Sequence, residues 1–370
     1  MSQTLQRRHG RTTPYGRRRA VLVAVLVLLA AAAFAAPRHL LNSDEGRRSL
    51  LNDKGRSSLL DDKDRPYLST DGWPASGQGA YVLRNGRPAV SPHQQPVPIA
   101  SVAKVMTAYL VLKHYPLRAS DSGPRFVVSQ DDVVDTEARR REGQSVVDVR
   151  AGEQLTERDA LMAILLPSAN NVAVLVARQV SGSVASFVAE MNRTARALGM
   201  SHTTYTDPSG RDEATVSTAL DQLRLARVVA GDQTLAAMMA TRSYSLPVAG
   251  EVTNTNALLG HDGFVGMKTG SDKAAGGCLM FRAVRATENG NRSLIGVVLG
   301  QRGDHLVNAA LDAAKQLVDR LAPNTAPPEA PGVPGMPGTP SAGQPGLAAP
   351  AGAYRRHIEN RIRAGNTTLP

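Results

Sequence analysis

The chain has 370 residues, of which 42% are hydrophobic and only 4% aromatic, so Val, Leu, Ala and Met must fill the core of two domains or of one large domain with extensions. The net charge is +11, but residues 1–36 contain six arginines and no acidic residue, which leaves only +3 for residues 76–320. Because a nucleic-acid site needs basic residues clustered on the fold, this distribution argues against nucleic acid as a partner. The chain has a single cysteine, Cys278, which excludes an intramolecular disulfide.

An apolar run at residues 20–36 follows a basic leader at residues 1–19. The run has no charged residue, and three arginines directly precede it. As a helix it would measure roughly 25 Å, barely enough to span the hydrocarbon core of a bilayer. Arginines on this flank keep the N-terminus in the cytoplasm, so we expect the rest of the chain outside the cytoplasmic membrane. The run predicts a membrane anchor, or a signal peptide cleaved after the small-x-small sequence Ala33-Phe34-Ala35; the long leader favours the anchor.

Residues 37–75 are polar and balanced in charge, which predicts a spacer, and a folded region is expected at residues 76–321. Its first signal is a hairpin, with Tyr81–Arg84 and Arg87–Val90 flanking an Asn85-Gly86 turn. A helix is expected at 101–114, and residues 126–230 are mostly helical, with breaks at glycines and prolines. The pattern then predicts three strands, a second Asn-Gly turn and a closing helix, at 265–269, 277–286, 294–299, 289–290 and 306–321 respectively.

Strands at both ends of this region, with helices between them, indicate an α+β domain with an inserted helical lobe. Residues 322–370 are rich in Pro and Gly and end in a basic stretch, which predicts a tail that cannot pack a core.

The helix expected at 101–114 carries the first chemistry-bearing pair. It begins SVAKVMTAYLVL, and Lys104 is the one charged residue in that stretch. A helix that is apolar on all sides is buried, and burial lowers the pKa of a lysine. Ser101 lies three residues earlier on the same helix face, so the pair predicts a nucleophile beside a neutral amine that acts as its general base. The plainer alternative is a lysine that extends to the surface.

A second group, Ser168-Ala169-Asn170, falls where the helical pattern breaks after Pro167. Side chains in such a break point into clefts, where a hydroxyl and an amide could relay a proton and hold a substrate amide. The alternative is a helix cap, for which Ser and Asn are well suited.

The third group is Lys268-Thr269-Gly270, followed by Ser271, on a predicted strand. A cation and a hydroxyl suit a substrate carboxylate, and Gly270 would let a peptide lie against the strand edge. An ordinary solvated strand end is the alternative for this group taken alone.

The three groups occur in the order S-x-x-K, S-x-N, K-T-G, which is typical of penicillin-binding proteins and class A β-lactamases. The sequence resembles the serine D-Ala-D-Ala carboxypeptidases, which are low-molecular-mass penicillin-binding proteins of peptidase family S11. Beyond the motifs, the segments IASVAKVMTAYL, LLPSANNVAVLVA and VGMKTGSDKAAGGCLM carry the resemblance. It implies the β-lactamase/transpeptidase-like α+β fold, an antiparallel sheet flanked by helices with an all-helical lobe.

The resemblance also implies a reaction and roles for the site residues. Ser101 would attack the carbonyl between the terminal D-alanines of a peptidoglycan stem pentapeptide, and Lys104 would take its proton. Water would then release the acyl group, and β-lactam antibiotics would acylate the same serine. The remaining roles are as follows: Ser168 and Asn170 line the cleft, Lys268 and Thr269 face the terminal carboxylate beside Gly270, and the N–H groups of Ser101 and Ser271 form an oxyanion hole.

One departure concerns the carboxylate. Relatives often carry an arginine shortly before the K-T-G strand, whereas this chain has Thr255 there. Recognition of the carboxylate should therefore rest more on Lys268 and Thr269.

Other functions fit less well. A D,D-endopeptidase that cleaves cross-links would use the same serine chemistry and stays open. A class A β-lactamase needs a deacylating glutamate in an E-x-x-L-N pattern, which residues 171–267 lack. A non-catalytic wall-binding scaffold would have little use for Ser101, Lys104 and Lys268. The histidines show no metal-ligand spacing, and we expect neither a metal nor a cofactor.

Overall fold

The computed structural model describes residues 65–323, apart from residues 70, 71, 85, 119 and 289. The predicted leader (1–19), the anchor or signal peptide (20–36) and most of the spacer (37–75) and tail (322–370) lie outside the described residues.

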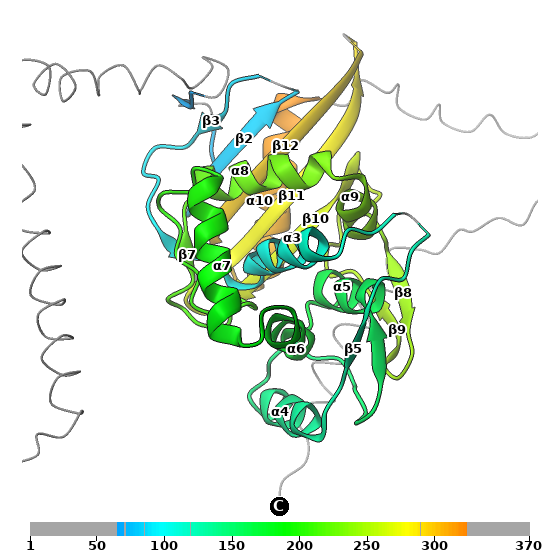
Figure 1. The fold of residues 1–370 in the computed structure, drawn as a ribbon. Coiled ribbons are helices and arrows are strands. Elements are labelled where there is room, and N and C mark those ends of the chain that lie inside the picture. Colours follow the sequence, from blue (N-terminus) through cyan, green and yellow to red (C-terminus); the bar gives the residue numbers. More distant parts are fainter. Residues whose placement is uncertain (1–64, 70–71, 85, 119, 289, 324–370) are drawn as a thin grey trace, which may run out of the picture. The chain divides into compact units, whose positions relative to one another are not determined.

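The described chain alternates short strands with helices and then returns to long strands (Figure 1). Its first elements are β1 (Tyr67–Leu68), β2 (Gln78–Leu83), β3 (Ala89–Val90), β4 (Val97–Pro98), the 3₁₀ turn η4 (Ala100–Ala103), α3 (Lys104–His114), β5 (Arg125–Val127), α4 (Gln130–Arg141), β6 (Gln154–Thr156), α5 (Glu157–Leu165), α6 (Asn170–Ser181) and α7 (Val184–Ala197). The later elements are β7 (Val216–Ser217), α8 (Ala219–Gly231), α9 (Gln233–Met239), β8 (Ser243–Leu246), β9 (Gly250–Thr253), β10 (Phe264–Asp272), β11 (Gly276–Thr287), β12 (Gly290–Gln301) and α10 (Leu306–Leu321).

The largest sheet among the described residues has six strands in the order β1-β3-β2-β12-β11-β10, so β10 is an edge strand. All neighbours are antiparallel except β1 and β3. The predicted hairpins and the closing helix at 306–321 are confirmed. Strand β1 and Trp73, whose ring packs at a tilt against that of Tyr81, lie inside the segment predicted as a spacer, so the fold begins before residue 76.

Both predicted Asn-Gly turns are displaced by one residue. The Gly86 N–H donates to the Leu83 carbonyl at 2.9 Å, and Thr287 pairs with Gly290, so each glycine closes its turn instead of lying at its centre. The cause is strand register, which is set by the side chains that must be buried on each face of the sheet and not by the turn residues alone.

The sheet separates two apolar cores. Figure 1 shows α10 on one face of the sheet and α8 with the helical lobe on the other. Strand residues alternate between the two cores: Leu279 and Phe281 pack with α10, whereas Cys278 and Met280 pack on the other side. Each of these four side chains is fully buried, and full burial of a side chain such as Leu or Phe contributes about 1.5–3 kcal/mol. The two cores fix the sheet between α10 and the lobe, and with it the position of edge strand β10.

The inserted lobe consists of α4 to α7, with α3 packed between lobe helices α5 and α6 and helix α8. Two of its helices begin with reciprocal capping boxes, formed by Ser129 with Asp132 and by Thr156 with Asp159. Within residues 65–323, leaving aside the gaps named above, no single helix is long and apolar enough to cross a membrane; α6 and α7 reach that length and composition only as a pair bent by 87°.

Candidate active site

The S-x-x-K residues lie at the junction of η4 and α3, whose neighbouring residues belong to the apolar core on the side of the helical lobe. Ser101 belongs to the 3₁₀ turn and Lys104 is the first residue of α3. The residues that follow Lys104 are apolar on all sides and almost all buried, as the sequence predicts. The Lys104 Nζ is 2.8 Å from the Ser101 Oγ. The hydroxyl therefore lies within hydrogen-bond reach of an amine that could take its proton.

The Lys104 side chain has no exposed surface. Burial lowers the pKa of its amine well below the ordinary value, and the nearby cations Lys268 and Arg139 lower it further, while Asp207 acts in the opposite direction. The amine is thus neutral under conditions where an exposed lysine is charged, which is the form a general base requires.

A turn from the loop before α8 holds this lysine. Besides Ser101, the Lys104 amine contacts the Ser209 carbonyl oxygen at 2.8 Å. The Thr107 hydroxyl donates to the Pro208 carbonyl at 2.6 Å, which ties the same turn to α3. Gly210 has φ +75°, and a Cβ there would lie 1.8 Å from the Ala100 carbonyl oxygen, so only glycine fits. The sequence motifs do not include this turn, although Asp207-Pro208-Ser209-Gly210 is a typical turn sequence.

The S-x-N residues lie between α5 and α6, as expected, but α6 begins at Asn170 itself. Ser168 has φ +68° and is 5% exposed, and its Oγ has no hydrogen-bond partner among the described residues. Asn170 donates from Nδ2 to the Gln144 side chain at 2.9 Å, while its Oδ1 has no partner within the same residues. A strained backbone and unsatisfied buried polar atoms are typical of a site that is completed by its ligand.

The K-T-G residues lie in the middle of edge strand β10 and not at its end. Lys268 is 1% exposed, burial lowers its pKa to about 7, and its Nζ donates to the Thr269 carbonyl at 3.0 Å. The Thr269 and Thr255 hydroxyls lie 2.5 Å apart. Thr255, which stands where relatives often have arginine, therefore contacts the K-T-G motif with a hydroxyl in place of a guanidinium.

The structure requires a glycine at position 270 for a different reason from the one predicted. A Cβ at this position would lie 2.9 Å from both the Ser101 and Val102 amide nitrogens and 3.1 Å from the Ile99 carbonyl oxygen. The glycine thus lets β10 approach the backbone of the 3₁₀ turn, and it brings the Ser101 N–H next to the strand. Amides in the first turn of a helix have no intrahelical acceptor, so this N–H is suited to a developing oxyanion.

A cleft of about 590 Å³ lies over these elements. Of the predicted site residues, Ser101, Asn170 and Ser271 line it. The other five, Lys104, Ser168, Lys268, Thr269 and Gly270, are buried. The rest of the cleft is lined by residues 142–145, by the charged residues Arg211, Glu213, Asp272 and Lys273, and by Ala100 and Gly210.

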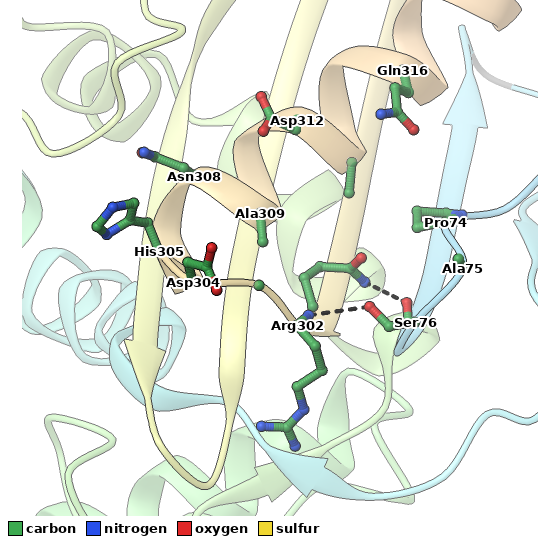
Figure 2. A pocket seen from close by; sticks show the side chains of 13 residues that line it. Pro74, Ala75, Ser76, Arg302, Asp304, His305, Asn308, Ala309, Asp312 and Gln316 are labelled. Carbon is green, nitrogen blue, oxygen red and sulfur yellow. Dashed lines mark hydrogen bonds between the residues drawn. The ribbon is translucent and has the colours of Figure 1, made fainter. Parts of the chain in front are cut away.

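A second cavity, of about 460 Å³, lies beside α10 (Figure 2). Figure 2 shows Pro74, Ala75 and Ser76 facing α10 across it, with Ser76 bonded to the end of β12. None of the three motifs contributes to it. Within the described part of the chain, no group of three or more His, Cys, Asp or Glu side chains could hold a metal ion.

The sequence model of peptidase family S11, described as D-alanyl-D-alanine carboxypeptidase, matches residues 89–303. The chain is 30% identical over 207 residues to D-alanyl-D-alanine carboxypeptidase DacF of Bacillus subtilis, which covers 54% of this chain and 50% of that protein. It is 33% identical over 226 residues to a D-alanyl-D-alanine endopeptidase of Escherichia coli, which covers 57% of this chain and 67% of that protein. The chain thus spans about half the length of the Bacillus relative.

Solved structures show the same fold. The Streptomyces K15 DD-transpeptidase superposes with a TM-score of 0.58 at 23% identity, covering 68% of this chain and 98% of that one. The D-alanyl-D-alanine carboxypeptidase DacD from Francisella tularensis gives a TM-score of 0.56 at 21% identity, covering 71% and 73%. The predicted α+β class is therefore confirmed.

Proposed function

The chain belongs to the D-alanyl-D-alanine carboxypeptidase family of serine peptidases, family S11, and we propose that it removes the terminal D-alanine from peptidoglycan stem pentapeptides. The observation that carries this proposal is the 2.8 Å contact between Ser101 and a lysine with no exposed surface. It supplies a nucleophile and a neutral base in one hydrogen bond.

In the acylation step, the Ser101 hydroxyl gives its proton to Lys104 while its oxygen attacks the carbonyl between the two D-alanines. The negative charge that develops on the carbonyl oxygen is stabilised by the Ser101 and Ser271 N–H groups. The proton now on Lys104 passes to the amine of the leaving D-alanine, with the Ser168 hydroxyl, which has no partner among the described residues, as the relay. Water then attacks the acyl-enzyme and restores Ser101.

The substrate carboxylate is bound by Lys268 and Thr269. Lys268 is buried and its pKa is lowered to about 7, so an arriving carboxylate favours its charged form. Because the two buried lysines repel each other when both are protonated, the charge of Lys268 disfavours protonation of Lys104. This fits their roles, since Lys104 acts as a neutral base and Lys268 as a cation that binds the carboxylate. Penicillins, which carry a carboxylate and a reactive carbonyl, would acylate Ser101 in the same way.

A second candidate is cleavage of D-Ala cross-links, as named for the Escherichia coli relative that is 33% identical. Mass spectrometry of products from a muropeptide mixture separates the two activities. A carboxypeptidase releases free D-alanine from pentapeptides and leaves cross-linked dimers intact, whereas an endopeptidase converts dimers to monomers. If neither product forms and the β-lactam nitrocefin is turned over rapidly instead, the proposal is refuted.

We also propose that the domain acts outside the cytoplasmic membrane, led or held there by residues 20–36. These residues lie outside the described part of the chain, so the proposal is supported by sequence: an uncharged apolar run directly follows three arginines. Mass spectrometry of the N-terminal peptide from cells tests this: a membrane-bound protein that retains the run indicates an anchor, and a new N-terminus near Ala36 indicates a signal peptide. Recovery in the cytosol with the run intact would contradict both.

A further inference from the structure

The Lys104 amine has one partner that dictates its orientation. A neutral amine has two N–H groups and one lone pair, and only the lone pair can take the proton of Ser101. The Ser209 carbonyl oxygen, 2.8 Å from Nζ, can only accept, so it must receive an N–H. This contact leaves the lone pair free for the hydroxyl of Ser101, also at 2.8 Å.

The Asp207 carboxylate builds the turn that presents this carbonyl. Both of its oxygens are used, and all its donors come from the turn or from Thr215 just after it. The donors are the Ser209 N–H at 2.9 Å, the Ser209 hydroxyl at 2.5 Å, the Gly210 N–H at 3.1 Å, the Arg211 N–H at 3.1 Å, the Asp212 N–H at 3.4 Å and the Thr215 hydroxyl at 2.9 Å. A carboxylate with this many donors fixes the turn more firmly than a neutral group would.

Asp207 also contributes charge. Three charged side chains act on Lys104: Lys268 from β10, Arg139 from α4, and Asp207 from the turn. The two cations disfavour the protonated amine, and Asp207 is the one anion of the three. The carboxylate therefore keeps the amine basic enough to accept a proton, against burial and two positive neighbours.

We propose that Asp207 is a positioning residue for acylation, which holds the turn that orients Lys104 through the Ser209 carbonyl and which acts on that amine with its own negative charge. The proposal rests on the proposed function, in which Lys104 takes the proton of Ser101. In that step the O–H bond of Ser101 breaks, its proton goes to the Lys104 lone pair, and the oxygen electron pair forms the bond to the carbonyl carbon. Asp207 neither gives nor takes a proton.

The test is the rate of acylation by a fluorescent penicillin, measured against pH for the wild type and for Asp207→Asn. Acylation needs neutral Lys104, so its rate rises as the pH passes the lysine pKa. Loss of the anion lowers that pKa, so the acid limb of the profile moves to lower pH. The plateau rate falls on the order of 10- to 100-fold, because the base is less well oriented.

The matched control is Asp221→Asn. Asp221 is a buried carboxylate that also accepts from a backbone N–H and a hydroxyl, those of His202 and Thr203, but it is not among the groups acting on Lys104. This variant should lose stability while its acid limb stays in place. If Asp207→Asn has the wild-type plateau, or a lower plateau with an unmoved acid limb, the proposal is overturned.

A further variant covers the case in which Asp207→Asn does not fold. Asp207→Glu keeps the charge and displaces the carboxylate, so its plateau should fall while its acid limb stays near that of the wild type. A wild-type plateau in this variant also overturns the proposal. Failure of the wild type itself to be acylated would refute the proposed function instead, so the two outcomes are distinct.

Discussion

Gly270→Ala should disable the site through backbone geometry alone. The added Cβ would lie 2.9 Å from the Ser101 and Val102 amide nitrogens, about 0.5 Å closer than the 3.4 Å at which ordinary contact begins. The atoms it meets belong to the backbone of η4 and cannot rotate away. Strand β10 and the 3₁₀ turn must therefore move apart by several tenths of an ångström.

Two magnitudes follow from this displacement. Overpacking of a close-packed core costs about 1–3 kcal/mol of unfolding free energy. Displacement of the nucleophile relative to the strand that binds substrate costs more in rate, since misplacement by about 1 Å lowers the rate on the order of 100-fold. We expect acylation by a fluorescent penicillin to fall between about 10- and 100-fold, with a smaller loss in thermal stability.

Gly231→Ala is the matched control. Gly231 ends α8, does not have a left-handed backbone, and a Cβ there would meet nothing within 4 Å. This variant should keep its acylation rate and gain about 0.4–1 kcal/mol. If Gly270→Ala is acylated at the wild-type rate with an unchanged melting temperature, the close approach of β10 to η4 does not shape the site.

Three further predictions concern buried polar groups. Because burial lowers the pKa of Lys268 to about 7, kcat/KM for a pentapeptide should fall as the pH rises through that value. Lys268→Arg should move this alkaline limb of the pH profile to higher pH. A limb at the same pH in both enzymes would contradict the assignment of Lys268. Burial raises the pKa of Glu157 to about 8, above its unfolded value of about 4.5. The folded state therefore binds the proton of this carboxyl more tightly than the unfolded state. The resulting contribution to the free energy of unfolding is complete below pH of about 4.5 and is lost as the pH rises towards 8. Glu157→Gln should therefore be more stable than the wild type in thermal melts at pH 8, by about 1–2 kcal/mol after allowance for solvent screening, and equal melts would refute this. Ser168→Ala removes a hydroxyl without a partner among the described residues, so unfolding free energy should change by less than about 0.5 kcal/mol while peptide turnover falls about 100-fold; unchanged turnover would exclude a proton relay through Ser168.

The sequence alone predicts those features that are determined by residues near one another in the chain. The closing helix begins and ends where its apolar pattern does, at Leu306 and Leu321. The burial of Lys104 follows from the apolar residues around it, because a helix with apolar residues on all sides has no polar face to turn towards solvent.

Other features depend on tertiary contacts that no local pattern records. The contact of the Ser209 carbonyl with the Lys104 amine joins segments 105 residues apart. Strand β1 has two residues and β5 has three, too few to show a period. Gly270 is required by the close approach of η4 to β10, and a glycine in a strand pattern predicts such an approach without identifying the segment that makes it.

The central claim is that Ser101 becomes acylated with Lys104 as its base. The most direct test is intact-protein and peptide mass spectrometry of the wild type and of Ser101→Ala after incubation with penicillin. We predict one acyl group per wild-type chain, mapped to the peptide that contains Ser101, and none on the variant. An acyl group on another residue, or one that persists in Ser101→Ala, would contradict the claim.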